Sequence, residues 1–189
     1  MNLKLEQLLD RFHDLTPHRQ AHILRVVVVM EELANRHDLD FELSRWAGFG
    51  HDLAREFDRH RLLEEARRLG LTIDRFFRQE PVLLHGPIAA TWLRIARIGN
   101  ASVWQAIWQH TTAGPGLSPL AKALYVADGA EPGRCYPERE GLLETAMEDL
   151  EAGYRGVLRQ SVQYAHRRGL EIHSDTQRAL AEAGVRDLT

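Results

Sequence analysis

The chain has little cysteine, no long apolar run and no strong excess of either charge. Its 189 residues include one cysteine, Cys135, so no intramolecular disulfide can form, as is usual in a reducing compartment. Apolar runs such as Val26 to Met30 are far shorter than the roughly 20 residues of a membrane span. The N-terminus lacks the charged start and apolar stretch of a signal peptide. We therefore expect a cytoplasmic protein with no membrane partner.

The charge balance and the missing motifs exclude further classes. The 24 basic and 27 acidic residues nearly cancel, which argues against dedicated nucleic-acid binding but leaves room for a local phosphate pocket. The sequence contains no Gly-x-Ser-x-Gly elbow, Walker-type loop or Gly-x-Gly-x-x-Gly fingerprint. Cys135 has no clear activating base nearby in sequence, and one cysteine cannot form a two-CxxC zinc site. The sequence therefore offers little support for an enzyme that works through a covalent intermediate on a nucleophilic side chain.

The chain also lacks β alternation of useful length, and its turn signals divide it into helices. Thr16-Pro17 and Ser118-Pro119 each combine an N-cap residue with proline at the first helical position. We expect an all-α bundle of eight to ten helices that forms one domain over residues 1–189, with Asp175 capping the last helix. The expected helices span residues 2–14, 17–36, 41–54, 59–69, 73–78, 87–98, 101–111, 119–128, 139–168 and 175–183.

What the chain has in abundance is histidine, with ten residues, and their placement is informative. A His-Asp pair ends an apolar helical run, and four further residues lie in apolar helical settings. A divalent metal accepts this mixture of imidazole and carboxylate ligands. We expect one mononuclear or binuclear site, with Asp52 as the carboxylate that bridges two ions and His51 and Asp52 as catalytic residues. The six candidate ligands are His22, His51, Asp52, His85, His110 and Asp128.

The alternative for any one of these residues is a hydrogen-bonded core histidine or a surface polar group. As a set they favour a bound cation. Asp128 lies at the end of an expected buried helix, and a charged aspartate in that position is costly without a partner. The other histidines suit simpler roles. His18 shares a helix face with His22 and could support it, and His173 is expected to be structural. The remaining four lie among charged residues and are expected to be solvated: His13, His37, His60 and His166.

Several side chains near these ligands suit an anionic substrate. Arginine binds phosphate through paired hydrogen bonds. Arg19 lies three residues before His22, Arg55 lies one turn after the His-Asp pair, and Arg134 lies in a loop after Asp128. Lys122 and Thr111 complete the set of candidate substrate contacts. The alternative for each cation is an exposed salt bridge.

These motifs resemble the HD-domain metal-dependent phosphohydrolases, whose pattern is a histidine, a His-Asp pair and a late aspartate. Further segments resemble the YqeK family over most of the chain, from about residue 15 to 174. Those segments are His18-Arg19-x-x-His22, Gly50-His51-Asp52-Leu53-Ala54-Arg55, Leu84-His85-Gly86-Pro87, His110-Thr111-Thr112, Tyr125-Val126-Ala127-Asp128 and Glu131-Pro132-Gly133-Arg134.

The resemblance implies a symmetrical diadenosine tetraphosphate hydrolase that cleaves Ap4A to two ADP. It implies an iron pair or a similar metal pair on the six candidate ligands, although manganese, cobalt, nickel and zinc also suit them. The implied mechanism is attack by a metal-bound hydroxide on a phosphorus of the polyphosphate chain. Two departures from the family pattern concern substrate preference: Arg55 replaces a frequent lysine, and Gly48-Phe49-Gly50 replaces bulky aliphatic residues.

Two other functions remain open from the sequence. One is an HD phosphohydrolase that acts on another nucleotide, since the same ligands would serve. The other is a nucleotide- or RNA-associated binding module with a structural metal, although such a site would be closed and need fewer ligands. A homodimer is also open, because the tryptophans at positions 92, 104 and 108 could pack internally or at a dimer face.

Overall fold

The computed structural model describes residues 4–185, and this part of the chain is helical without a strand. The all-α prediction is confirmed, with eleven α-helices and one short 3-10 helix in the described residues. These elements are α1 (Leu5–His13), α2 (Pro17–His37), α3 (Phe41–Gly50), α4 (Arg59–Arg68), α5 (Arg75–Gln79), η1 (Pro81–Leu84), α6 (His85–Ala96), α7 (Ala101–Gln109), α8 (Pro119–Ala130), α9 (Arg139–Glu148), α10 (Leu150–Arg167) and α11 (Ser174–Glu182).

The predicted cap-and-proline starts are present at both positions. The Thr16 hydroxyl accepts a hydrogen bond from the Arg19 amide at 3.3 Å, and Pro17 is the first residue of α2. The Ser118 hydroxyl accepts one from the Ala121 amide at 3.2 Å, ahead of α8. Each cap satisfies an amide that the first helical turn leaves unpaired. These two helices carry His22 and Asp128, so the caps set where two of the candidate ligands fall.

One predicted helix is wrong: residues 139–168 form two helices, which accounts for the helix beyond the expected ten. Asp149 has an extended backbone, and its carboxylate accepts a hydrogen bond from the Ala152 amide at 3.0 Å to begin α10. At the far end, the cap of α11 is His173 rather than Asp175, since the His173 ring accepts from the Asp175 amide at 3.1 Å. Residues 2 and 3 of the predicted first helix lie outside the described residues.

Two other predicted boundaries differ next to the candidate ligands. The helix predicted for residues 41–54 ends at Gly50, and residues 51–56 form turns. The helix predicted from residue 87 begins at His85, directly after η1, and ends at Ala96 because Arg97 adopts the left-handed conformation. His51, Asp52 and His85 therefore lie at helix ends, and all three are buried.

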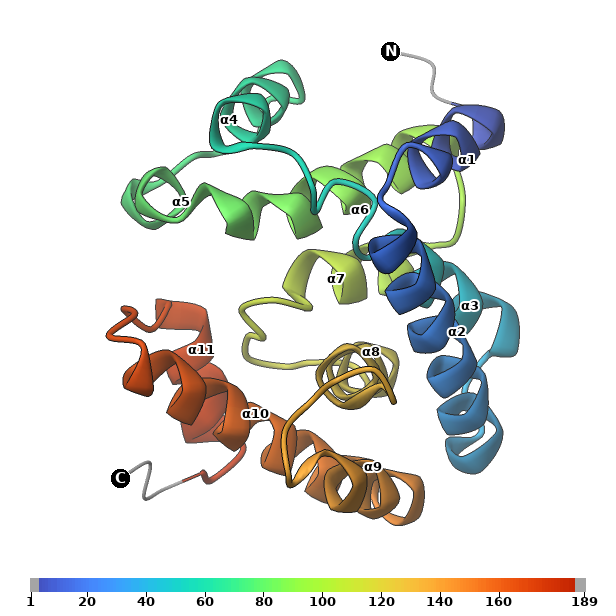
Figure 1. The fold of residues 1–189 in the computed structure, drawn as a ribbon, viewed down its shortest axis with the longest axis vertical. Coiled ribbons are helices and arrows are strands. Elements are labelled where there is room, and N and C mark those ends of the chain that lie inside the picture. The colour runs from blue at the N-terminus through green and yellow to red at the C-terminus, as the bar shows by residue number, and fades with distance from the viewer. Residues whose placement is uncertain (1–3, 186–189) are drawn as a thin grey trace.

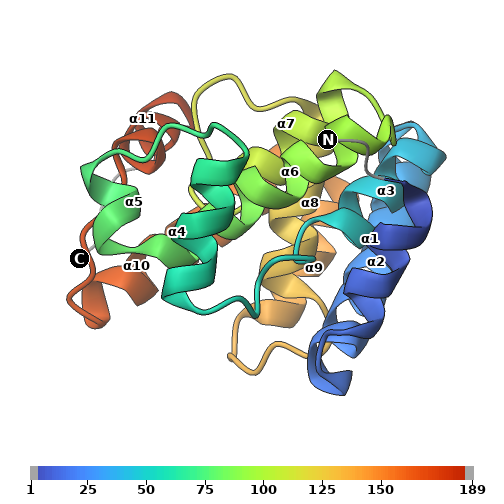
Figure 2. The same ribbon diagram turned by 90° about the horizontal axis from the view of Figure 1, so that it is seen from above.

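Helix α8 runs through the middle of the fold, and α2, α3, α7, α9 and α10 pack around it (Figure 1). The view from above shows α4 and α5 on one side of the molecule and α1, α2 and α3 on the other (Figure 2). The core is continuous and includes the fully buried Trp92, whose indole donates to Glu65 at 2.7 Å. None of the helices in residues 4–185 is long and apolar enough to cross a membrane. Segments from α2, α3, α6, α7 and α8 therefore face one another in the interior.

Candidate metal centre

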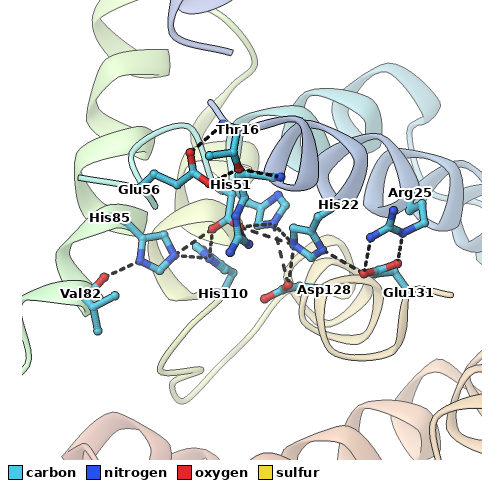
Figure 3. A network of polar contacts seen from close by, with 12 residues as sticks. Thr16, His22, Arg25, His51, Glu56, Val82, His85, His110, Asp128 and Glu131 are labelled. Atoms are coloured by element: carbon cyan, nitrogen blue, oxygen red, sulfur yellow. Dashed lines mark hydrogen bonds and ion pairs between the residues drawn. The ribbon is translucent and has the colours of Figure 1, made fainter. Parts of the chain in front are cut away.

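Five separate segments bring the six candidate ligands together. His22 lies on α2, the His51-Asp52 pair follows α3, and Asp128 lies on α8. His85 begins α6 and His110 follows α7. All the histidines and Asp52 are at most 3% exposed, and the Asp128 side chain is 21% exposed. Figure 3 shows His85 and His110 on one side of the cluster and His22 on the other.

The Asp52 carboxylate lies between two pairs of histidines, with one oxygen toward each pair. Its Oδ2 lies 3.5 Å from Nε2 of both His22 and His51. Its Oδ1 lies 3.1 Å from Nε2 of His85 and 3.8 Å from Nε2 of His110. Two groups of three residues could each hold a metal ion, and Asp52 belongs to both. This is the arrangement expected of a bridging carboxylate.

Asp128 extends the first of these groups. Its Oδ1 lies 3.2 Å from Nε2 of His22 and 3.9 Å from Nε2 of His51. One position is therefore surrounded by two imidazoles and two carboxylates, and the other by two imidazoles and one carboxylate. The second position has fewer protein donors, which leaves room for water or substrate beside an ion.

In each of the four histidines of the cluster, Nδ1 contacts an oxygen atom of the chain, so Nε2 is available to bind a metal ion. Nδ1 of His51 lies 2.7 Å from the Gly48 carbonyl oxygen, and Nδ1 of His110 lies 2.7 Å from the Ile107 carbonyl oxygen. Nδ1 of His85 lies 2.5 Å from the carbonyl oxygen three residues earlier, that of Val82. A carbonyl oxygen only accepts, so Nδ1 carries the hydrogen, and each ring in its neutral form presents a lone pair at Nε2.

These lone pairs face one another at distances that suit a shared ion. Nε2 of His22 lies 3.3 Å from Nε2 of His51, and Nε2 of His85 lies 2.9 Å from Nε2 of His110. Two nitrogens that bind one ion at about 2.1 Å lie about 3.0 to 3.4 Å apart when their angle is about 90° to 110°. A lone pair directed at another lone pair is unfavourable without a proton or a metal ion between them. The donor set therefore fits a pair of divalent ions.

Burial and charge set the ionisation of the cluster. Burial lowers the pKa of His51 to about 4, against the opposing effect of Asp52, so this ring is neutral at pH 7. Burial would raise the pKa of Asp128, but hydrogen bonding to His22 and the charge of Arg134 outweigh it and lower the pKa. Burial is likewise outweighed at Asp52, where the neighbouring histidines hold the pKa well below its usual value. The neutral ring and ionised carboxylates are the forms that bind metal.

Glu131 is a site residue that the sequence analysis missed. It is 1% exposed, and its Oε1 lies 3.1 Å from Nδ1 of His22. Its other oxygen accepts hydrogen bonds at 2.5 Å from Arg25 Nε and at 2.5 Å from the Gly133 amide. These bonds outweigh burial and lower the pKa of Glu131 to about 2. The carboxylate therefore does for His22 what the backbone carbonyls do for the other three rings (Figure 3).

A cavity of about 410 Å³, here called the basic cavity, opens beside the cluster. The candidate substrate residues Arg19, Arg55, Thr111 and Arg134 line it together with four of the candidate ligands, Asp52, His85, His110 and Asp128. Arg19 also contacts Asp52 Oδ2 at 2.5 Å, and Arg134 pairs with Asp128. The cavity therefore joins the candidate metal positions to guanidinium groups, which suits a phosphate-bearing ligand.

Lys122 is not among the residues that line the basic cavity. Its ammonium group lies 2.5 Å from a Glu151 carboxylate oxygen on α10, and it also faces the Tyr154 ring. Lys122 therefore has an acidic partner within the chain, and its contact with phosphate stays a prediction. The sequence could not reveal that partner, because Glu151 belongs to another helix.

Among the other histidines, His37 differs from its expected role and His173 agrees with it. His37 was expected to be solvated, but its Nε2 lies 2.7 Å from the Ala146 carbonyl oxygen and the residue is half-buried. His173 is structural as expected, since it caps α11 and packs its ring against Phe76 at 4.8 Å. The others outside the cluster are exposed: His13, His18, His60 and His166.

The unusual glycines before the His-Asp pair allow close packing. A Cβ atom at Gly50 would lie 2.8 Å from side-chain carbons of both Leu93 and Ile107. A Cβ atom at Gly48 would lie 3.1 Å from the Val27 Cα. The end of α3 therefore lies directly against its neighbours. This departure from the family pattern is a matter of packing in the core behind the site.

A helical bundle that gathers a histidine, a His-Asp pair and a late aspartate around candidate metal positions defines a class of metal-binding hydrolases. The chain belongs to that class: the HD domain family matches residues 19–133. It is 30% identical to a symmetrical bis(5'-nucleosyl)-tetraphosphatase of Halalkalibacterium halodurans, over 86% of this chain and 87% of that protein. A symmetrical bis(5'-nucleosyl)-tetraphosphatase of Bacillus subtilis is 27% identical over the same shares.

A solved structure agrees with these relatives. It is described as a predicted HD superfamily hydrolase involved in NAD metabolism, from Clostridium acetobutylicum. It is 27% identical to this chain and superimposes with a TM-score of 0.89 over 99% of this chain and 100% of its own. The resemblance to the YqeK family of HD domains is therefore confirmed.

Proposed function

We propose that this protein is a metal-dependent hydrolase that cleaves dinucleoside tetraphosphates symmetrically, releasing two ADP from Ap4A. The observation that carries the proposal is the Asp52 carboxylate, whose two oxygens face two different histidine pairs at the wall of the basic cavity. The similarity to proteins named symmetrical bis(5'-nucleosyl)-tetraphosphatase supports the choice of substrate.

The proposed metal ligands are the six residues of the cluster, with Asp52 shared between two ions. When bound, a divalent pair supplies a water nucleophile of lowered pKa and neutralises charge that develops on the phosphoryl oxygens. Iron is the proposed metal, although manganese, cobalt, nickel and zinc suit the same donors. The proposed ligands are His22, His51, Asp52, His85, His110 and Asp128.

The role of the chain is to orient the polyphosphate and to keep the ligands in their binding forms. Arg19 pairs with Asp52, and Arg134 pairs with Asp128. The remaining N–H groups of both arginines are positioned for phosphates that flank the scissile bond. Arg55 adds a third guanidinium to the same cavity. A symmetrical cut requires attack at an inner phosphate, so the substrate must lie lengthwise with two phosphates on either side.

The test is product analysis with the metal content recorded. Ap4A is incubated with protein that has been loaded with iron, manganese or cobalt, and the nucleotides are resolved by chromatography. We expect ADP as the sole product and a loss of at least about a thousandfold in Asp52→Ala, because the shared ligand is removed. Asp10→Ala is the matched control, since Asp10 is exposed on α1. ATP plus AMP as products would refute the symmetrical cut.

A second candidate is an HD hydrolase that acts on another nucleotide. The observation in its favour is the Clostridium acetobutylicum structure, which is described as involved in NAD metabolism. Turnover of a dinucleotide such as NAD or of a nucleoside monophosphate, with no turnover of Ap4A, would favour this candidate. Tight nucleotide binding with no turnover of any substrate would instead favour a binding module.

A further inference from the structure

A second hollow, here called the side cavity, adjoins the basic cavity. It has a volume of about 180 Å³ and lies between η1, the end of α10 and the segment that leads into α11. The two cavities share five lining residues, so they are continuous. The shared residues are Val82, Leu83, Thr111, Tyr125 and Ser161.

The two cavities differ sharply in charge. The basic cavity carries three arginines beside the candidate metal positions. Among the described residues that line the side cavity there is neither lysine nor arginine, and the acidic ones are Glu80 and Glu171. Phosphate groups therefore belong in the basic cavity and are disfavoured in the side cavity. The side cavity suits the uncharged part of the same ligand.

The lining of the side cavity suits an aromatic ring. Phe76 and His173 lie in its wall with ring centroids 4.8 Å apart and planes at 90°. The apolar side chains of Leu170, Ile172 and Ala165 also line it. Aromatic walls bind nucleobases of any sequence by stacking, because every base has a π face. The carboxylates of the two glutamates could accept hydrogen bonds from an exocyclic amino group.

Thr111 lies where the two cavities meet, and its hydroxyl is buried without a hydrogen-bond partner among the described residues. The Oγ1 atom is shielded from solvent, and nothing in residues 4–185 forms a hydrogen bond with it. A buried hydroxyl without a partner is costly, and a bound ligand would remove that cost. A sugar hydroxyl would reach this position when the phosphates lie on one side and the base on the other.

We propose that the side cavity binds the nucleobase of one half of the substrate, with Thr111 at the ribose. The proposal rests on the proposed function, because the phosphates of the same ligand must lie in the basic cavity. It assigns substrate selection to residues of η1, α5, α10 and the segment before α11, none of which carries a candidate metal ligand. Base recognition and metal binding are therefore separable by mutation.

The test is calorimetric titration of manganese-loaded protein with ADP and, separately, with pyrophosphate, which lacks base and sugar. We expect ADP to bind at least about tenfold more tightly than pyrophosphate, since stacking of a base on an aromatic side chain is worth about that much. Ala165→Phe should fill the side cavity and abolish this preference without changing pyrophosphate binding. Phe76→Ala should reduce the preference about tenfold by removing the stacking ring.

The matched control is Ala152→Phe, because Ala152 lies on the same helix with similar burial but lines a different hollow. The proposal is overturned if wild type shows no preference for ADP. It is also overturned if both cavity variants keep the preference, or if Ala152→Phe loses it as well. Failure of the proposed function would appear separately, as ADP binding without turnover of Ap4A.

Discussion

Replacing Glu131 with glutamine removes a buried charge that organises one side of the metal centre. In the wild type the carboxylate contacts His22, Arg25 and the Gly133 amide at once. Glutamine has nearly the same shape but only one accepting oxygen, so at least one of these donors loses its partner. The variant therefore tests both the stability of the fold and the hold on His22.

The lowered pKa of Glu131 gives the expected size of the effect. Folding moves the pKa from 4.5 to about 2, and each unit corresponds to about 1.4 kcal/mol. Because the folded pKa is lowered, this contribution is fully present above pH 4.5 and is lost as pH falls toward 2. It amounts to about 3 kcal/mol at pH 7 and about 1 kcal/mol at pH 3. At pH 7 the loss should lower the melting temperature by about 6 to 12 °C.

The assay is urea unfolding of metal-free wild type and Glu131→Gln at several pH values from 7 to 3. We expect the difference in unfolding free energy between the two proteins to shrink by about 2 kcal/mol over this range. A difference that stays constant with pH would refute the reasoning, because it would mean that the charge of Glu131 is not what stabilises the fold. In parallel, the variant should bind metal about 10- to 100-fold more weakly, as is usual when a partner of a ligating histidine is lost.

Three further predictions follow from the same geometry. His110→Ala should reduce the metal content from two ions to one per chain, measured by elemental analysis; unchanged content would contradict the two-position assignment. Removal of the metal by a chelator should lower the melting temperature by about 5 to 10 °C when the metal had been at about 100 times its dissociation constant, and an unchanged melting temperature would argue against a bound ion. Gly50→Ala should destabilise the fold by about 1 to 3 kcal/mol in urea unfolding, because its Cβ would lie 2.8 Å from two side chains. Gly141→Ala is the control, since nothing lies within 4 Å of its added Cβ, and an equal loss there would contradict the packing argument.

The sequence was sufficient for those features that depend on local chemistry. The starts of α2 and α8 were predicted because a hydroxyl cap and a proline act within one helical turn. The set of six candidate ligands was predicted because histidine and aspartate are unusual in apolar helical surroundings. Their residue types were informative even though no distance between them can be read from a sequence.

Other features depend on contacts between distant segments and were missed. Glu131 is separated by 109 residues from His22, and a glutamate before proline and glycine is usually part of a solvated loop. Its one sequence clue is its position in the segment shared with the YqeK family. The break at Asp149 was also missed, because an aspartate inside a helical pattern is more often an exposed helical residue than a cap. The close approach at Gly50 could not be inferred without knowing which side chains face α3.

The way the four rings are held bears on how such a centre can change over evolutionary time. A substitution at position 82 or 107 keeps the backbone carbonyl oxygen that holds the ring of His85 or His110. The carbonyl oxygen of residue 48 holds His51 in the same way, although the close packing around Gly48 restricts the side chain there. The orientation of three ligands is thus inherited with the fold rather than with particular side chains. His22 alone takes its orientation from a replaceable group, Glu131. Variation in metal preference among descendants of this protein should therefore arise first at position 131, where a single codon change alters the contact that holds the His22 ring and leaves the other three rings in place.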